Sequence, residues 1–301
     1  MKSLIENPNS IIIFETFLYL ATAFILFFIG KVVYSMVHAR INVKDELVKK
    51  DNLAFALAII GYYIGLLLAI GSAIIGPSKG IVLDLVDIGI YGLLAIILLN
   101  LSSFINDAVI LSKFKIEKEI VDDRNAGTGV VLAASYIASG LIIFGAVSGE
   151  GENFFPGLSW GYTLSGIVSA VSFWFIGQII LVITAYFYNL ITPYNVHEHI
   201  EKDNVAVGIG FAGALISLAN LVRHGISGDF IGWTENAYWL GIEIMIGLAF
   251  LPIVRLITDK VLLPGEKLTD EIINQEHPNI GAAMIEAFAY IGGSVIITWC
   301  L

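Results

Sequence analysis

The sequence predicts an all-α membrane protein in which eight transmembrane helices form two parallel four-helix repeats. The first observation is composition: 57% of the 301 residues are hydrophobic and only 14% are charged, whereas soluble domains average about 45–50% and about 25%. The second is a series of eight apolar runs, each near the roughly 20 residues that a helix needs to cross a bilayer. The third is a set of polar residues that recurs at a fixed distance along the chain.

The composition also argues against several classes of function. A chain with a mean hydropathy of +0.85 has too few polar residues to cover a water-facing globule, so we expect the lipid bilayer as its environment. The net charge of −10 argues against nucleic acid as a partner, because binding to phosphates needs a basic surface. The single cysteine, Cys300, provides neither an internal disulfide nor a cysteine metal site. No catalytic motif is visible, so we expect no enzyme activity, no cofactor and no metal.

Each apolar run defines one expected helix. The first run is too long for a signal-peptide core and lacks a cleavage pattern, so we expect a retained span. The second, fourth, sixth and eighth runs open with asparagine, a favoured helix N-cap. Asp84 and Asp87 open the third run and suit the positive end of a helix dipole. The fifth run ends before Pro193, and the seventh ends before the loop that holds Lys260. The expected spans are Ile11–Val37, Asn52–Gly76, Leu83–Leu111, Asn125–Val147, Thr163–Ile191, Asn204–Val222, Ala237–Ile257 and Asn279–Cys300.

The distribution of lysine and arginine predicts the orientation of the chain. Eleven of these residues lie in the loops that follow spans one, three, five and seven, and three lie on the other side. Basic residues are enriched in cytoplasmic loops. We therefore expect a multi-pass membrane protein with both termini outside the cytoplasm.

The chain contains an internal repeat. Lys50-Asp51-Asn52 before span two recurs as Lys202-Asp203-Asn204 before span six, 152 residues later, and the same distance relates Asp107 to Asp259. A two-residue insertion then relates Asn125 to Asn279. Chance similarity between apolar helices is the alternative, but it does not easily produce polar matches in loops. Because each unit has an even number of spans, both enter the membrane in the same direction. We expect a first repeat over residues 1–149, an external linker over 150–162 and a second repeat over 163–301.

Small residues follow one face of span two. Ala54, Ala58, Gly61, Gly65, Ala69, Ser72 and Gly76 are spaced three or four residues apart, and Ala206, Gly210, Gly213 and Ser217 repeat the pattern in span six. Small faces let helix backbones approach closely in lipid. Tight packing is therefore the expected role, and a pore or substrate path along the face is the alternative.

Polar residues also mark the starts of the even-numbered spans. They are Asp51, Asn52, Asn125, Asp203, Asn204 and Asn279. Short Asp and Asn side chains accept hydrogen bonds from the free N–H groups of a first helical turn, so capping explains them. A polar vestibule at the membrane surface is the second interpretation, since helix N-termini favour anions.

Glu286 is the strongest candidate for a functional residue. It lies seven residues past Asn279, on a face with Ala282, Ala289 and Gly293, so we expect it to face neighbouring helices. A carboxylate within a membrane is costly and therefore a functional candidate. It could bind a proton reversibly, or be a neutral, hydrogen-bonded structural acid. The first repeat has Leu132 at this position, so the two repeats are not chemically equivalent.

Further polar residues extend this candidate ion or proton path. They are Glu243 in span seven, as an outer relay, and Asn220 and Ser217 in span six. Arg255 lies three turns further along span seven and is expected to reach the lipid headgroups. A water-filled cavity at Glu286 would favour transport, whereas a dry, hydrogen-bonded acid would favour a structural role.

The second repeat resembles the YjfL-like bacterial inner-membrane family, a domain of unknown function with four membrane helices. The residues that carry the resemblance are Ile191-Thr192-Pro193-Tyr194-Asn195, Asp203-Asn204-Val205-Ala206 and Asn279-Ile280-Gly281-Ala282-Ala283 with Glu286. The internal repeat extends the resemblance to the first half, so the chain looks like a tandem two-copy member. The resemblance implies an inner-membrane location and no particular activity.

Two hypotheses of function follow. The first is a channel or transporter-like protein for protons or small cations that uses the buried carboxylate of Glu286. The alternative is a structural or scaffold protein in envelope maintenance or stress response, with a peripheral cytoplasmic protein as its partner. Single-unit relatives would have to pair with themselves to mimic the fused form, so we also consider a homo-oligomer.

Overall fold

The computed structural model describes residues 8–76, 78–110, 115–263 and 265–301. Within these ranges it contains eight helices that are long and apolar enough to cross a membrane, and no strand, which confirms the predicted fold class. They are α2 (Pro8–Val37), α3 (Leu53–Ile74), α4 (Ile81–Ile105), α5 (Ala126–Val147), α6 (Gly161–Ile191), α8 (Val205–Ile226), α9 (Trp233–Ile257) and α11 (Ile280–Cys300).

The ends of several expected spans differ by a few residues in the structure, and Leu111, the expected end of the third span, lies outside the described residues. The two largest differences in the second repeat concern α8 and α9. Helix α8 continues one turn past Val222, to Ile226, and α9 begins at Trp233 instead of Ala237. The extra turn of α8 holds Arg223 and His224, and each makes a side-chain hydrogen bond within the helix bundle. A basic residue in the sequence therefore does not end this helix, because its polar atoms have partners inside the protein.

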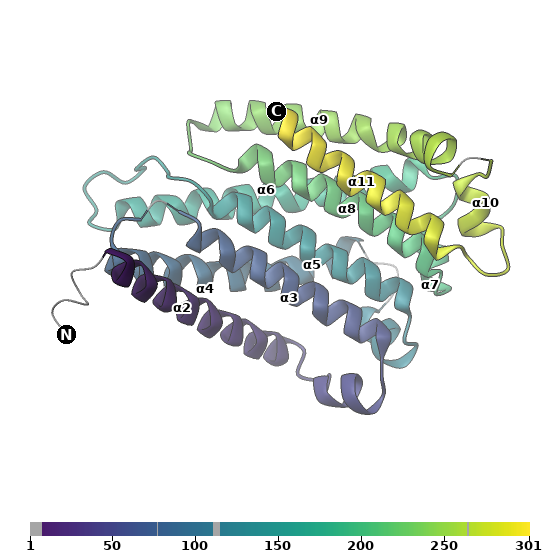
Figure 1. The fold of residues 1–301 in the computed structure, drawn as a ribbon, viewed down its shortest axis with the longest axis horizontal. Helices are drawn as coiled ribbons and strands as arrows, with labels where there is room; N and C mark the ends of the chain where they lie inside the picture. The colour runs from purple at the N-terminus through teal and green to yellow at the C-terminus, as the bar shows by residue number, and fades with distance from the viewer. Residues whose placement is uncertain (1–7, 77, 111–114, 264) are drawn as a thin grey trace.

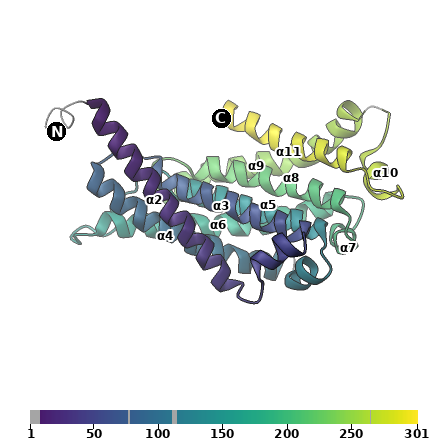
Figure 2. The same cartoon turned by 60° about the horizontal axis from the view of Figure 1, so that its bottom comes forward.

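The helices form two staggered layers. One layer is the row α3, α5, α8, α11, in which each helix packs along the next; these four lie as parallel diagonals in Figure 1. The second layer is α2, α4, α6, α9, where α4, α6 and α9 each lie over the groove between two helices of the first layer. Helix α2 lies at one end against α3 and α4 and crosses them obliquely in Figure 2. Because α5 packs on α8, the two repeats form one continuous bundle.

Small residues allow the close packing of the first row. A β-carbon at Gly61 of α3 would collide with the backbone of Ala133 on α5, and one at Gly129 of α5 would lie 2.6 Å from the carbonyl oxygen of Ala54 on α3. The predicted small face of α3 is buried from Ala54 to Ser72, while Gly76 is exposed. This is the close backbone approach that stabilises helix pairs in lipid.

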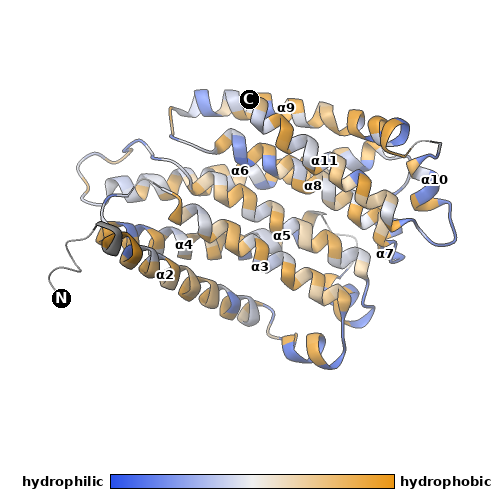
Figure 3. Ribbon diagram, in the orientation of Figure 1, coloured by the Kyte–Doolittle hydropathy of each residue, from blue (hydrophilic) through white to orange (hydrophobic). Residues whose placement is uncertain are grey.

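A short helix precedes each member of this row, which the sequence analysis did not predict. These are η1 (Asp45–Lys49), η3 (Lys118–Asp122), α7 (Val196–Glu201) and α10 (Leu268–Ile273). Two further short π-helices, η2 (Asn106–Ile110) and η4 (Thr258–Leu262), continue α4 and α9. In Figure 3, hydrophilic residues gather in α7 and α10, whereas the long helices are largely hydrophobic. The short helices therefore form a polar layer at one end of the bundle.

Asparagine N-caps join the four short helices to the row. The Oδ1 atoms of Asn52, Asn125, Asn204 and Asn279 each accept a hydrogen bond from the backbone N–H three residues later. The Nδ2 atoms of the first three donate to the carbonyl oxygens of Ile120, Ile200 and Ile272, each in the short helix before the next member of the row. We call the side with these caps the asparagine end.

Asn279 lies at the end of this chain of hydrogen bonds. Its Nδ2 donates to Oε2 of Glu271, 2.6 Å away, within its own connection. Among the described residues it has no next segment to bind, because α11 is the last helix of the row. The caps therefore set the register between neighbouring helices as well as starting each one.

Buried glutamates support two of these caps. Glu46 and Glu119 accept hydrogen bonds from the Nδ2 atoms of Asn52 and Asn125. Burial alone would raise the pKa of Glu46, but the hydrogen bonds from Lys50 and Asn52 bring it below its ordinary value. Glu119 makes no such bond to a cation among the described residues, and burial raises its pKa.

Candidate functional site

A buried ion pair joins α9 and α11 in the second repeat. The Nη1 atom of Arg255 lies 2.9 Å from Oε1 of Glu286, and these residues are 8% and 0% exposed. The Nη2 atom of Arg255 donates to Oγ1 of Thr269 at 3.0 Å, and its guanidinium lies over the ring of Tyr194. The expectation that Arg255 reaches the lipid headgroups is therefore wrong: its partners lie inside the protein.

Helices α6 and α8 complete the surroundings of Glu286. A β-carbon at Gly210 of α8 would collide with Oε2 of Glu286 and lie 2.9 Å from the hydroxyl oxygen of Tyr188 on α6. Glycine therefore leaves the space that the carboxylate occupies. Oε1 also accepts a long hydrogen bond, 3.4 Å, from the hydroxyl of Tyr290. Oε2 makes no hydrogen bond of normal geometry to the described residues.

A second polar cluster lies toward the opposite end of the same helices. Nδ1 of His224 lies 2.9 Å from Oε1 of Glu243, which is 5% exposed. One turn earlier, Nδ2 of Asn220 donates to Oγ of Ser294 on α11, and Nε of Arg223 donates to Oδ1 of Asn220. The structure thus brings Asn220 and Glu243 into one connected region.

One face of α8 connects the two clusters. Gly210, Ser217, Asn220 and His224 are separated by seven, three and four residues, so they lie along one face. The rise of a helix over this interval is about 21 Å. Ser217 is buried between the clusters and donates its Oγ hydrogen to the carbonyl of Ala214. We call this set, with Glu286 and Glu243 as its two acids, the polar line.

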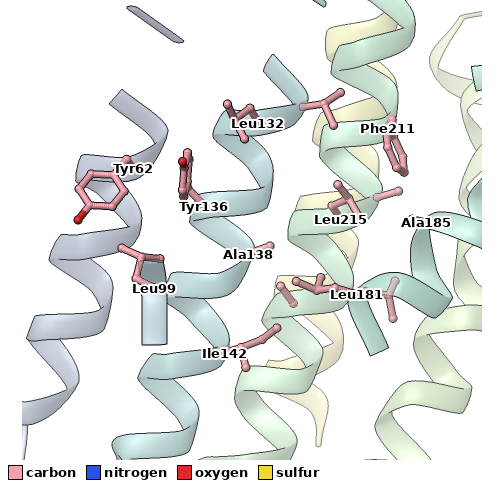
Figure 4. Close-up of a cluster of buried hydrophobic side chains, with 14 of the residues drawn as sticks. Tyr62, Leu99, Leu132, Tyr136, Ala138, Ile142, Leu181, Ala185, Phe211 and Leu215 are labelled. Carbon is pink, nitrogen blue, oxygen red and sulfur yellow. The ribbon is translucent and has the colours of Figure 1, made fainter. Parts of the chain in front are cut away.

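The first repeat lacks this line. Its equivalent positions on α3 are Ala58, Gly65, Leu68 and Ser72. Leu132 and Ser103 stand where the second repeat has Glu286 and Arg255. Figure 4 shows Leu132 on α5 near Tyr136, within a cluster of buried hydrophobic side chains. The two repeats therefore share a fold but differ in their buried polar groups.

The helix-start motif occupies the asparagine end, away from the centre of the polar line. Its four asparagines act as N-caps. Asp51 and Asp203 each precede a cap and adopt φ values of 48° and 58°, which Asp tolerates better than most residues. Asp203 also accepts a hydrogen bond from the N–H of Gly127. These contacts fit the capping interpretation, and the vestibule interpretation stays a prediction.

Sequence reasoning missed three members of the site. Arg255, His224 and Tyr188 were not placed with the acids, although Arg255 stands inside an apolar run, which is itself a signal. The acids that they lie beside are 19 to 98 residues away along the chain. In the part of the chain that the structure describes, no group of three or more His, Cys, Asp or Glu residues could hold a metal ion.

Known proteins support the membrane assignment and the duplication. The family described as Domain of Unknown Function (DUF350) matches residues 8–147 and again 162–301. A "UPF0719 transmembrane protein" of Aquifex aeolicus (strain VF5) is 21% identical over 261 residues, which cover 85% of this chain and 88% of that protein.

A shorter relative corresponds to one repeat. The "UPF0719 inner membrane protein YjfL" of Escherichia coli (strain K12) is 27% identical over 145 residues, which cover 46% of this chain and 98% of that protein. No solved structure matches. The comparisons confirm the predicted family resemblance, and with the eight apolar helices they establish an integral, multi-pass membrane protein. Because the family profile covers almost the whole chain in two copies, this protein is a tandem two-copy member of the DUF350 family.

Proposed function

We propose that the second repeat carries protons across the membrane. Glu286 binds and releases the proton, and Glu243 with His224 is the relay at the opposite end. The observation that carries the proposal is the polar line, in which Ser217, Asn220 and His224 of α8 lie on one face between two buried acids. Buried ionisable groups on one protein-facing path are typical of proton relays in membrane proteins.

The charge beside Glu286 favours protons over metal cations. The guanidinium of Arg255 stays charged at all physiological pH values and lies 2.9 Å from the carboxylate. A sodium or potassium ion at the same carboxylate would be repelled by this fixed charge. A proton instead forms a covalent O–H bond on Oε2, the oxygen that has no hydrogen bond of normal geometry among the described residues.

Flux measurements in proteoliposomes test the proposal. The purified chain is reconstituted with a pH-sensitive dye inside, a potassium gradient with valinomycin sets the potential, and proton entry is recorded. We expect Glu286→Gln to reduce the flux at least about tenfold, because the amide does not exchange protons. Glu235→Gln is the matched control, since it changes an exposed acid of α9.

Each outcome of this experiment has a clear meaning. A wild-type flux equal to that of empty liposomes overturns the transport proposal. Wild-type flux that Glu286→Gln leaves unchanged removes Glu286 from the path. Flux of sodium or potassium at the proton rate contradicts the argument from Arg255.

The surroundings of Glu286 favour a second candidate, a structural or scaffold protein. A buried, hydrogen-bonded acid is the expected sign of a structural role, and Glu286 is 0% exposed and paired with Arg255, while the cavity described below lies in the first repeat. A carboxylate paired with a fixed cation inside the bundle can serve packing alone, and the polar short helices at the asparagine end offer a surface to a peripheral protein. This candidate predicts no flux and predicts that substitutions in the loop Lys113–Arg124 abolish recovery of a partner. Glu286→Gln would then leave partner recovery unchanged.

We propose further that the asparagine end faces the cytoplasm of a bacterial inner membrane and that both termini lie outside. Basic residues support this orientation, since Lys50, Lys118 and Lys202 belong to the asparagine end. The single cysteine, Cys300, is exposed at the other end and provides a native probe. We expect a membrane-impermeant maleimide to label Cys300 when the outer membrane alone is opened. Labelling only after the inner membrane is broken would reverse the orientation.

A further inference from the structure

A cavity of about 370 Å³ opens at the asparagine end of the first repeat. Its floor is apolar and consists of Phe55, Ala58 and Leu132. Ser103 and Asp107, from α4 and its extension η2, line its wall. Neither acid of the polar line lines it, so it is a feature separate from the proposed proton path.

The second repeat has a cationic side chain at the position that corresponds to this cavity. At the internal distance of 152 residues, Ser103 corresponds to Arg255, whose guanidinium fills the equivalent place in the second repeat. Beyond the β-carbon, serine has a hydroxyl group where arginine has an ethyl-guanidinium group. The cavity therefore lies where the second repeat holds a cationic side chain.

Acidic residues line the first repeat's cavity. Thr269, which accepts a hydrogen bond from Arg255, corresponds to Glu117 in the first repeat, and Glu117 lines the cavity. Asp107 lines it too, and its buried Oδ1 atom has no hydrogen-bond partner among the described residues. The corresponding Asp259 instead accepts a hydrogen bond of 2.7 Å from the N–H of Leu268. The carboxylate of Asp107 is thus left for another partner.

Two basic residues, Arg40 and His38, line the cavity, but neither compensates the charge of Asp107. Arg40 lies 3.9 Å from Glu117, and both side chains are more than half exposed, so their contact is a weak surface pair. His38 also lines the cavity, and burial lowers its pKa, which keeps the imidazole neutral at neutral pH. Among the described lining residues, Asp107 is the acid without a cationic partner.

We propose that this cavity binds an organic cation, an ammonium or guanidinium group that carries a short apolar part. The cation lies at Asp107, near the place that the guanidinium of Arg255 occupies in the second repeat, and the apolar part packs on Phe55, Ala58 and Leu132. A free amine and the ammonium of a lipid headgroup share this chemistry. The exposed apolar residues Val37 and Phe104 at the rim give both a route from the bilayer.

Binding of phenethylammonium to the full chain tests the proposal. Titration calorimetry is performed in nanodiscs of phosphatidylcholine and phosphatidylglycerol, and heats from empty nanodiscs are subtracted. We expect one site per chain. Asp107→Asn should weaken binding about ten- to a hundredfold, the range for loss of a charge-assisted contact. Asp87→Asn is the matched control, since this acid begins the same helix at the opposite end and pairs with Lys79 on the surface.

Two further binding measurements test the role of the charge. Phenethyl alcohol has the same apolar part without the charge, so we expect it to bind at least tenfold more weakly. Ser103→Arg should remove binding, because it supplies the guanidinium within the chain. The absence of binding to the wild type overturns the proposal, as does equal binding by Asp107→Asn or by the alcohol.

The lipid composition distinguishes the two sources of the cation. Phosphatidylcholine also carries an ammonium group, so nanodiscs of phosphatidylglycerol alone provide the reference. Adding phosphatidylcholine or phosphatidylethanolamine to them weakens phenethylammonium binding if a lipid headgroup is the natural ligand. Unchanged affinity assigns the site to a free amine. Either result requires that the Asp107→Asn variant shows no comparable binding.

Discussion

The ion pair of Arg255 and Glu286 allows a thermodynamic test that the first repeat itself provides. The first repeat carries Ser103 and Leu132 at these positions, so Arg255→Ser and Glu286→Leu are substitutions that the fold already contains. The two charged groups are 2.9 Å apart and almost fully buried. Removing one partner leaves the other charge uncompensated, which costs about 3–5 kcal/mol. Removing both leaves no orphan charge, so the double variant should cost about 2–3 kcal/mol less than the sum of the single variants.

The assay is reversible unfolding of the full chain in detergent micelles, followed by far-UV circular dichroism and by tryptophan fluorescence. The free energies of unfolding of the wild type, both single variants and the double variant form a double-mutant cycle. Glu235→Gln serves as the control for loss of an exposed acid. Single-variant costs that add to the double-variant cost within about 0.5 kcal/mol would refute the reasoning that the pair is energetically coupled.

Packing and capping give two further predictions. Gly213→Ala places a β-carbon about 2.5 Å from Cα of Ala287, so we expect overpacking to lower the free energy of unfolding by about 1–3 kcal/mol. Gly241 has open space around it, so Gly241→Ala should be neutral or stabilising in the same unfolding assay. Equal effects of the two substitutions would contradict the close-packing argument. Asn125→Ala removes a cap and a hydrogen bond to the next segment, so we expect a loss of about 2 kcal/mol, against about 1 kcal/mol for Asn279→Ala, which removes a cap without that link. The opposite order in thermal unfolding would show that the link between segments adds no stability.

The two repeats have the same fold but differ in their buried charged residues. Fusion of two copies allows one copy to lose a pair of buried charges while the other retains it, because each copy supplies helices to the same continuous row. The second repeat holds the polar line, and the first holds a cavity lined by Asp107, which has no cationic partner among the described lining residues.

The sequence alone determined the membrane environment, the eight spans and the duplication. These follow from composition, from the length of apolar runs and from polar matches at a constant distance, all of which are local or one-dimensional properties. The caps could be predicted for the same reason: an asparagine at the start of a helix binds N–H groups only three residues away. The ends of α8 and α9 could not be predicted as well, because a hydropathy profile contains no information about the hydrogen-bond partners of Arg223 and His224.

Only the tertiary structure decided which polar residues meet. Periodicity places Glu286 on the small-residue face of one helix, but it does not say which helix covers that face or at what height. The position of each first-row helix along its neighbour is set by the backbone contacts within the row and by the hydrogen bonds from the asparagine caps to the next short helix. The packing of α9 on α8 and α11 then brings Arg255 to Glu286, and a cavity lies at the equivalent point of the first repeat. The sequence does not predict this, because register between helices depends on packing in three dimensions and not on spacing along the chain.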